Sequence, residues 1–276
     1  MKIGVIIDCY KTDLVSALNL AADAGAGGAQ IYGKPELMAD SVALTKLWDA
    51  AQKRNVEISA IVADVADYQL DEKTKQEHLK RVIDFAGTKK AIVTGHIGVV
   101  PHDKNSKEYA DMVNTMQILG KAAINAGTSY GIETGPEIPE VLASFLDDVN
   151  GGVGVNLDPA NLMMVHGVNA VHAVEVLHKY IVYTHAKDGV HFQDCDAVKV
   201  YHAFAVGGFE ELCAQTGKIF EETPLGEGAV YFPAYLAALK RFNYDGYLTI
   251  EREVGANPQA DIELAINFLK KQLAVL

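Results

Sequence analysis

Four side chains that can bind a metal stand at the ends of short hydrophobic runs in the second half of the chain. They are Glu133, Asp158, His185 and Glu251. Three carboxylates and one imidazole suit a hard or borderline divalent cation, and they leave coordination positions open for substrate oxygens. A structural metal site is more often closed and rich in sulfur. The four residues therefore predict a catalytic centre with one divalent ion, with Mn²⁺ expected and Mg²⁺, Co²⁺ or Zn²⁺ as alternatives.

Such a centre can support proton transfer at a carbon next to a carbonyl group. A cation that chelates the carbonyl oxygen and an adjacent hydroxyl stabilises the enediolate that forms when the proton leaves. Glu133 and Glu251 are the expected catalytic bases, because they end different runs and can approach the substrate from opposite sides. Returning the proton to the same carbon inverts a stereocentre, and returning it to the neighbouring carbon interconverts an aldose and a ketose. The sequence leaves both reactions open.

The elements that position these residues follow a regular pattern. Short β-rich runs alternate with longer segments in which apolar residues recur every three or four positions, such as 40–54, 75–85, 109–126 and 261–275. This alternation is typical of a (β/α)8 TIM barrel, and we expect residues 1–276 to form one such domain. The eight expected strands are Lys2–Ile7, Gly28–Tyr32, Glu57–Val62, Ala91–Gly95, Tyr130–Glu133, Gly152–Leu157, Tyr180–His185 and Tyr247–Glu251.

Barrel geometry accounts for the position of the ligands. Active sites of such barrels form at the carboxyl ends of the strands, where all four residues are expected. The segment after the seventh strand, about 187–228, is far longer than an ordinary connection between strand and helix. We expect this long, irregular loop to cover the mouth of the site.

Composition narrows the class of protein. Hydrophobic residues make up 49% and charged residues 22%, which is typical of a globular chain. The net charge of −12 disfavours nucleic acid as a partner, because the average field repels phosphate. Three cysteines without a metal-binding spacing suit a reducing compartment. No apolar run reaches the roughly 20 residues of a membrane span, so we expect a cytoplasmic enzyme that does not bind membranes; a homo-oligomer is compatible with the sequence.

Five longer motifs carry a resemblance to a known group. The chain resembles the sugar phosphate isomerase/epimerase family of xylose isomerase-like TIM barrels over essentially its whole length. The motifs are Ile132-Glu-Thr-Gly-Pro-Glu137, Gly154-Val-Asn-Leu-Asp-Pro-Ala-Asn-Leu162, Thr184-His-Ala-Lys-Asp188, Thr223-Pro-Leu-Gly-Glu-Gly228 and Leu248-Thr-Ile-Glu-Arg-Glu253. The resemblance implies a metal-dependent isomerase or epimerase acting on a small sugar, a sugar phosphate or a related hydroxyketone. It also implies metal binding by the same Glu133, Asp158, His185 and Glu251.

Two positions differ from the ketose 3-epimerases of that family. Asn161 stands where those enzymes have a histidine, and His191 stands near the place of an arginine; both positions contact substrate in the relatives. Three further residues are expected near the substrate. His96 would bond a hydroxyl group, Lys187 would meet anionic charge, and Asp188 would accept a hydrogen bond near the metal ligands.

Other functions remain open at this stage. A lyase similar to inosose dehydratase would use the same metal and bases but expel a hydroxyl group. A barrel that binds sugar without catalysis would lack proton exchange. An endonuclease-type phosphodiesterase would need several zinc ions and more histidine ligands. The residues themselves also have a plainer interpretation, in which Glu133 and Glu251 cap helices or pair with Arg252 and Lys187, and His185 is a histidine at the rim with its hydrogen bonds satisfied.

Overall fold

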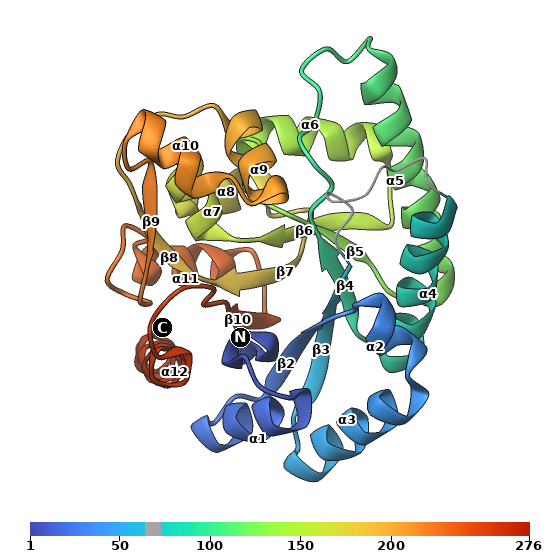
Figure 1. Cartoon of the computed structure of the whole chain (residues 1–276), viewed down its shortest axis with the longest axis vertical. Helices are drawn as coiled ribbons and strands as arrows, with labels where there is room; N and C mark the ends of the chain where they lie inside the picture. Colours follow the sequence, from blue (N-terminus) through green and yellow to red (C-terminus); the bar gives the residue numbers. More distant parts are fainter. Residues whose placement is uncertain (64–72) are drawn as a thin grey trace.

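Eight parallel strands form a closed barrel in the computed structural model, which describes residues 1–63 and 73–276 (Figure 1). Around the barrel the order is β1-β10-β7-β6-β5-β4-β3-β2. The strands are β1 (Lys2–Ile6), β2 (Gly28–Tyr32), β3 (Glu57–Val62), β4 (Ile92–Gly95), β5 (Tyr130–Glu133), β6 (Val153–Leu157), β7 (Ile181–Ala186) and β10 (Tyr247–Ile250). The predicted (β/α)8 barrel is confirmed, and each strand ends within one residue of its expected position.

Helices surround the barrel, and Figure 1 shows them on its outer side. Local signals in the sequence set their ends. In α3, for example, the side chain of Asp40 caps the first turn and Asn55 takes the left-handed conformation after the last. In the described residues, no helix has the length and apolar character needed to span a membrane. The helices outside the 187–228 segment are α1 (Leu14–Ala24), α2 (Pro35–Ala39), α3 (Ser41–Arg54), α4 (Lys73–Lys89), α5 (Lys107–Ala126), α6 (Pro139–Val149), α7 (Pro159–His166), α8 (Ala170–Leu177), α11 (Phe232–Arg241) and α12 (Pro258–Ala274), with a 3₁₀ turn at Ile7–Tyr10.

The hydrophobic core lies between the strands and the helices. Ile31, Val155 and Leu248 on the strands and Leu18 and Phe145 on the helices are completely buried. Burying one such side chain contributes about 1.5–3 kcal/mol relative to leaving it exposed. This continuous apolar layer keeps the strand ends fixed, and the carboxyl ends carry the candidate site.

The segment expected to be an irregular loop, 187–228, contains regular structure. It holds β8 (Asp188–His191), α9 (Ala197–Val206), α10 (Phe209–Thr216) and β9 (Phe220–Thr223), shown in Figure 1 beside α7 and α8. Strands β8 and β9 pair antiparallel and pack on α7. The rings of Phe204 and Phe209 stack at 4.4 Å between centroids, and those of Phe209 and Phe220 at 5.0 Å. This aromatic stack joins α9, α10 and β9, although Phe204 remains half exposed.

Candidate metal centre

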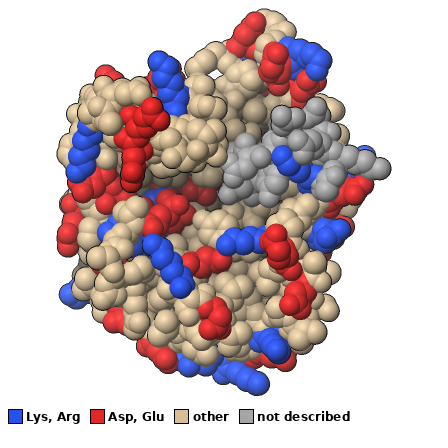
Figure 2. Space-filling view, viewed as in Figure 1, with Lys and Arg blue, Asp and Glu red and all other residues tan. Residues whose placement is uncertain are grey.

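The four predicted ligands meet at the carboxyl ends of neighbouring strands. Glu133 ends β5, Asp158 follows β6, His185 lies in β7 and Glu251 follows β10. All four side chains are buried, and one possible ligand atom from each lies within 4.8 Å of the others. Figure 2 shows a hollow near the middle of this view of the molecule, with acidic side chains along its wall.

The distances in this cluster fit a single ion. His185 Nδ1 lies 3.5 Å from Glu133 Oε1, 3.4 Å from Asp158 Oδ2 and 3.4 Å from Glu251 Oε2. Two ligands that each lie about 2.1 Å from one ion are about 3.0 Å apart at a right angle and about 3.4 Å apart at the tetrahedral angle, so these separations are compatible with a shared ion. Within the described ranges, neither His185 Nδ1 nor Asp158 Oδ2 makes a hydrogen bond, although both atoms are buried. Buried polar atoms without partners are costly, and a cation at the centre of the cluster would satisfy both.

The two carboxylate oxygens of Asp158 have different environments. Oδ1 accepts hydrogen bonds from the backbone amides of Ala160 at 2.8 Å and Asn161 at 2.9 Å, and so caps α7. Pro159 occupies the first helical position, where its missing N–H costs nothing. The Asp-Pro sequence thereby fixes the carboxylate and leaves Oδ2 directed at His185.

Opposite charges inside the cluster favour the charged forms of Glu251 and His185, whereas burial raises the pKa of Asp158. Burial opposes the charged form of Glu251, but the positive charges of Lys187 and then His185 outweigh it and hold the pKa of Glu251 well below its usual value. Burial also opposes the charged form of His185, and the charges of Glu133 and Glu251 raise the pKa of His185 well above its usual value. The charged forms of Glu251 and His185 are therefore stabilised by neighbouring charged side chains and not by solvent.

The second nitrogen of His185 has a partner that the sequence analysis missed. Nε2 lies 3.0 Å from Oε1 of Gln30, and the amide of Gln30 donates to Thr94 Oγ1 at 2.7 Å. Gln30 lies on β2 and is completely buried. A hydrogen bond to one ring nitrogen fixes the orientation in which the other faces a metal. A glutamine within the apolar run Gly28–Tyr32 is the sequence signal for this role.

We expect Gln30→Leu to lower the metal affinity by about 10–100-fold, as is typical for the loss of a partner that orients a ligand. Leucine fills similar space but cannot accept the proton of His185. Titration of the purified protein with Mn²⁺ by calorimetry measures the effect. Gln117→Leu, on the exposed face of α5, is the matched control. Equal Mn²⁺ affinity in the two variants would show that Gln30 does not orient His185.

Lys187 was expected at the substrate, but its ammonium group is held by carboxylates of the protein. Nζ lies 3.0 Å from Glu251 Oε2 and 3.8 Å from Glu222 Oε2, and it also contacts Glu253. The lysine side chain is almost fully buried. The plainer interpretation of Glu251, an ion pair with Lys187, is therefore correct, and it coexists with the proximity of Glu251 to His185.

We expect Lys187→Met to lower the free energy of unfolding of the metal-free protein by about 3–5 kcal/mol, because it leaves buried carboxylates without their counter-charge. Urea denaturation in the presence of a chelator measures this. Lys179→Met provides the control, since Lys179 pairs with Asp147 on the exposed surface and should matter little. If both variants unfold at the same urea concentration, the Lys187 network does not stabilise the fold.

Asp188 was expected to accept a hydrogen bond near the metal ligands, but its carboxylate organises a turn. Oδ2 accepts from the backbone amides of Gly226 at 2.9 Å and Gly228 at 3.0 Å, and Oδ1 accepts from Val230 at 3.0 Å. A side chain at Gly228 would lie 2.2 Å from Asp188 Oδ1, so this position requires glycine. Asp188 thus holds the end of the 187–228 segment against β8.

The other three residues expected at the substrate lie in two places. Asn161 Nδ2 donates to Glu133 Oε1 at 3.1 Å, and His96 Nε2 lies 3.6 Å from the same oxygen. Both therefore border the cluster. His191, at the end of β8, donates from Nδ1 to the carbonyl of Met164 at 2.9 Å and takes no part in the cluster.

A second acidic group lies near His96. Glu137 is buried and accepts a hydrogen bond from the amide of Val100 at 2.6 Å. Burial raises the pKa of Glu137 to about 7, although the Val100 hydrogen bond and the charge of His96 lower it. Glu137 can therefore hold a proton at neutral pH. Glu137 ends the motif that begins at Ile132, but the sequence predicted no role for it.

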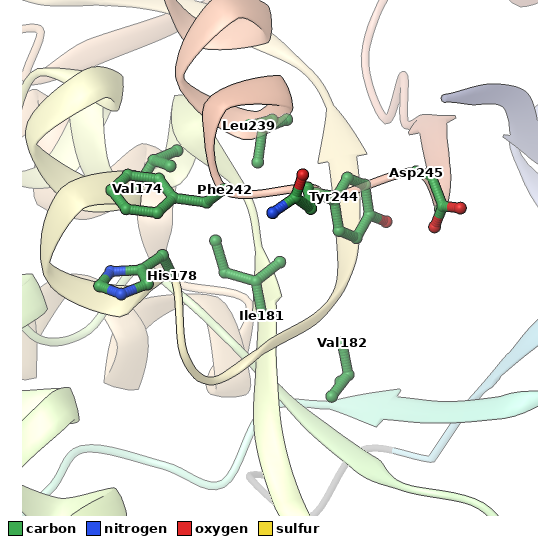
Figure 3. Close-up of a pocket in the computed structure, with 10 residues that line it drawn as sticks. Val174, His178, Ile181, Val182, Leu239, Phe242, Tyr244 and Asp245 are labelled. Atoms are coloured by element: carbon green, nitrogen blue, oxygen red, sulfur yellow. The ribbon is translucent and has the colours of Figure 1, made fainter.

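A separate cavity of about 310 Å³ lies at the amino ends of β7 and β10 (Figure 3). Val174, Ile181, Leu239 and Phe242 contribute to its lining, and the ring of Phe242 stacks on His178 at 4.1 Å. This end of a barrel ordinarily serves stability and not catalysis. The described residues place none of the four candidate ligands there.

Comparison with known proteins agrees with the barrel fold. A family model described as xylose isomerase-like TIM barrel matches residues 18–272. No curated protein matches the chain significantly in sequence.

Three solved structures share the fold over nearly the full length of both chains. A xylose isomerase domain protein from Planctomyces limnophilus is 24% identical, with 98% of this chain and 96% of that chain covered and a TM-score of 0.77. The probable 3-DHS dehydratase AsbF from Bacillus anthracis is 17% identical, with coverage of 98% and 99% and a TM-score of 0.76. D-allulose 3-epimerase from Methylomonas sp., in complex with D-allulose, is 20% identical, with coverage of 99% and 97% and a TM-score of 0.70.

Proposed function

The chain belongs to the xylose isomerase-like TIM barrel family, and we propose that it is a divalent-metal-dependent isomerase or epimerase of a small sugar or related hydroxyketone. The observation that carries the proposal is the buried cluster of Glu133, Asp158, His185 and Glu251. Within the described residues, two of its buried atoms, His185 Nδ1 and Asp158 Oδ2, have no hydrogen-bond partner. Similar folds in a D-allulose 3-epimerase and other sugar epimerases support the choice of reaction.

The four cluster residues would hold the ion, which we propose to be Mn²⁺. Their three carboxylates and one imidazole match a hard or borderline cation and exclude a sulfur-rich structural site. When bound, the ion would polarise the substrate carbonyl and neutralise charge that develops on its oxygen.

Glu133 and Glu251 would move the proton. They come from β5 and β10, on either side of His185, and each is held by a neighbour: Glu133 by Asn161 at 3.1 Å and Glu251 by Lys187 at 3.0 Å. Fixed carboxylates lose less freedom when the substrate binds. One would remove the proton from the carbon next to the carbonyl and the other would return a proton from the opposite side.

A dehydratase remains the second candidate, and Glu137 is the observation that favours it. A carboxyl group with a pKa of about 7 can donate a proton to a departing hydroxyl group at neutral pH. The fold of the probable 3-DHS dehydratase AsbF is also similar. The same removal of a proton by Glu133 or Glu251 would then lead to loss of water.

Product identification tests these proposals. The purified protein with added Mn²⁺ is incubated with a panel of ketoses, ketose phosphates and cyclic polyol ketones, and products are separated and weighed by mass spectrometry. An isomer of unchanged mass supports the isomerase or epimerase, and a product lighter by one water supports the dehydratase. A sugar that binds but is never converted would indicate a barrel without catalytic function.

The proposal extends to the cellular compartment and the oligomeric state of the enzyme. The three cysteines form no disulfide, which suits a reducing compartment, and we propose that the enzyme acts in the cytoplasm. Assembly into a homo-oligomer is compatible with the proposal and is tested by light scattering of the purified protein.

A further inference from the structure

Tyr201 comes to the metal centre from outside the barrel. It lies on α9, in the segment after β7, and its ring centroid is 5.7 Å from that of His96. A methyl group placed on Gly135 would lie 1.8 Å from the Tyr201 hydroxyl and 3.1 Å from Cβ of Asn161. The hydroxyl therefore rests against the backbone two residues after Glu133, beside the residue that bonds Glu133.

The hydroxyl of Tyr201 differs from those of Tyr183 and Tyr244, which have protein partners. Tyr183 Oη lies 2.6 Å from both Ser59 Oγ and Thr249 Oγ1, and Tyr244 Oη donates to the carbonyl of Tyr247 at 2.8 Å. Among residues 1–63 and 73–276, nothing forms a hydrogen bond with the hydroxyl of Tyr201. A half-buried hydroxyl that lies against Gly135 and has no hydrogen-bond partner among the described residues is free to bind a ligand.

The surroundings determine which ligand group suits this position. Burial, followed by the charges of Glu133 and Glu137, raises the pKa of Tyr201 well above its usual value, so the hydroxyl keeps its proton and can donate. The negative charge of Glu133 would repel a phosphate group at the same place. A neutral hydroxyl group can accept from Tyr201 and donate to a carboxylate, and so fits both neighbours.

We propose that Tyr201 binds one hydroxyl group of the substrate, at a carbon that does not react, and thereby selects the sugar. This assignment rests on the proposed function. It makes Tyr201 a residue for specificity, and it places an uncharged part of the substrate against α9. If the substrate carries a phosphate, the phosphate lies away from Tyr201.

The first test compares Tyr201→Phe with wild type on the unphosphorylated ketohexose that the Mn²⁺-loaded protein converts fastest, from a panel including D-allulose and D-tagatose. Loss of one hydrogen bond is expected to lower kcat/KM by about 3- to 10-fold, mainly through KM, with the Mn²⁺ affinity unchanged. Tyr180→Phe is the control: its hydroxyl contacts Asp147 on the surface, before the start of β7, and kcat/KM should not change.

A series of monodeoxy derivatives of that ketohexose then identifies the group that Tyr201 binds. Wild type and Tyr201→Phe should have equal kcat/KM for one derivative, the one that lacks the bonded hydroxyl, and should differ for the others. An equal loss for every derivative, a loss of Mn²⁺ affinity, or no loss would overturn the assignment. If wild type and Tyr201→Phe convert the parent sugar with the same kcat/KM, the role of Tyr201 is wrong and the proposed function still stands. If wild type converts no sugar, the proposed function fails and the assignment fails with it.

Discussion

Glu133→Gln and Glu251→Gln are each expected to lower turnover by about 10²–10⁴-fold, the usual contribution of a general acid or base. Glutamine keeps an oxygen that can coordinate a cation, but it cannot accept a proton from carbon. Substrate and metal binding should therefore fall much less than kcat. The two variants should also differ in which direction of the reaction is slowed more, because each carboxylate faces one side of the substrate. Each substitution should be more harmful for the stereoisomer whose proton that carboxylate removes.

Steady-state kinetics in both directions, together with calorimetric titration of Mn²⁺, measure these effects. Glu140→Gln is the control, because Glu140 is exposed and pairs with His172 on the surface. Turnover at the wild-type rate in both glutamine variants, with metal retained, would mean that another group moves the proton. His96, 3.6 Å from Glu133 Oε1, would be the first to test.

The second large effect concerns metal binding itself. Asp158→Asn or His185→Ala should weaken Mn²⁺ binding by more than the roughly 10–100-fold that is typical when a residue that only hydrogen-bonds to a ligand is lost. The effect should be larger because Asp158→Asn removes the charge of a ligand and His185→Ala removes the ligand itself. The fold should persist in Asp158→Asn, because the asparagine can still cap α7 through Oδ1.

Calorimetry on each purified variant gives the Mn²⁺ affinity, and circular dichroism checks the fold. The exposed substitutions Asp49→Asn and His172→Ala serve as controls. An affinity equal to that of the controls would exclude the substituted residue as a ligand. The other three residues would then hold the ion without it, and the proposed four-ligand centre would be wrong.

The barrel and its cluster could be predicted because both depend on local pattern. Runs such as Val153–Leu157 are short, mostly apolar and buried throughout, and the alternation of strands and helices permits few other folds. Once the fold is a barrel, a polar residue at the end of a strand must lie at the carboxyl rim. Glu133, Asp158, His185 and Glu251 therefore follow from four strand ends without any knowledge of contacts.

Contacts between distant segments could not be predicted in the same way. Gln30 meets His185 across 155 positions of sequence, and neither residue reveals the other. Lys187 was assigned to the substrate because the sequence does not show that Glu222, on β9, approaches it. The partners of Asp188 could not be predicted for a similar reason, since they include amides of a turn about 40 residues later. The role of Tyr201 depends on how α9 folds back over Gly135.

Proton exchange with solvent tests the central claim most directly. The Mn²⁺-loaded protein is incubated in D₂O with the ketose that it converts, and the product is examined by NMR and mass spectrometry. Transfer by Glu133 and Glu251 predicts one deuterium at the carbon that receives the proton, because the second carboxylate exchanges its proton with solvent. Complete conversion of the sugar without any deuterium in the product would contradict proton transfer by the two carboxylates.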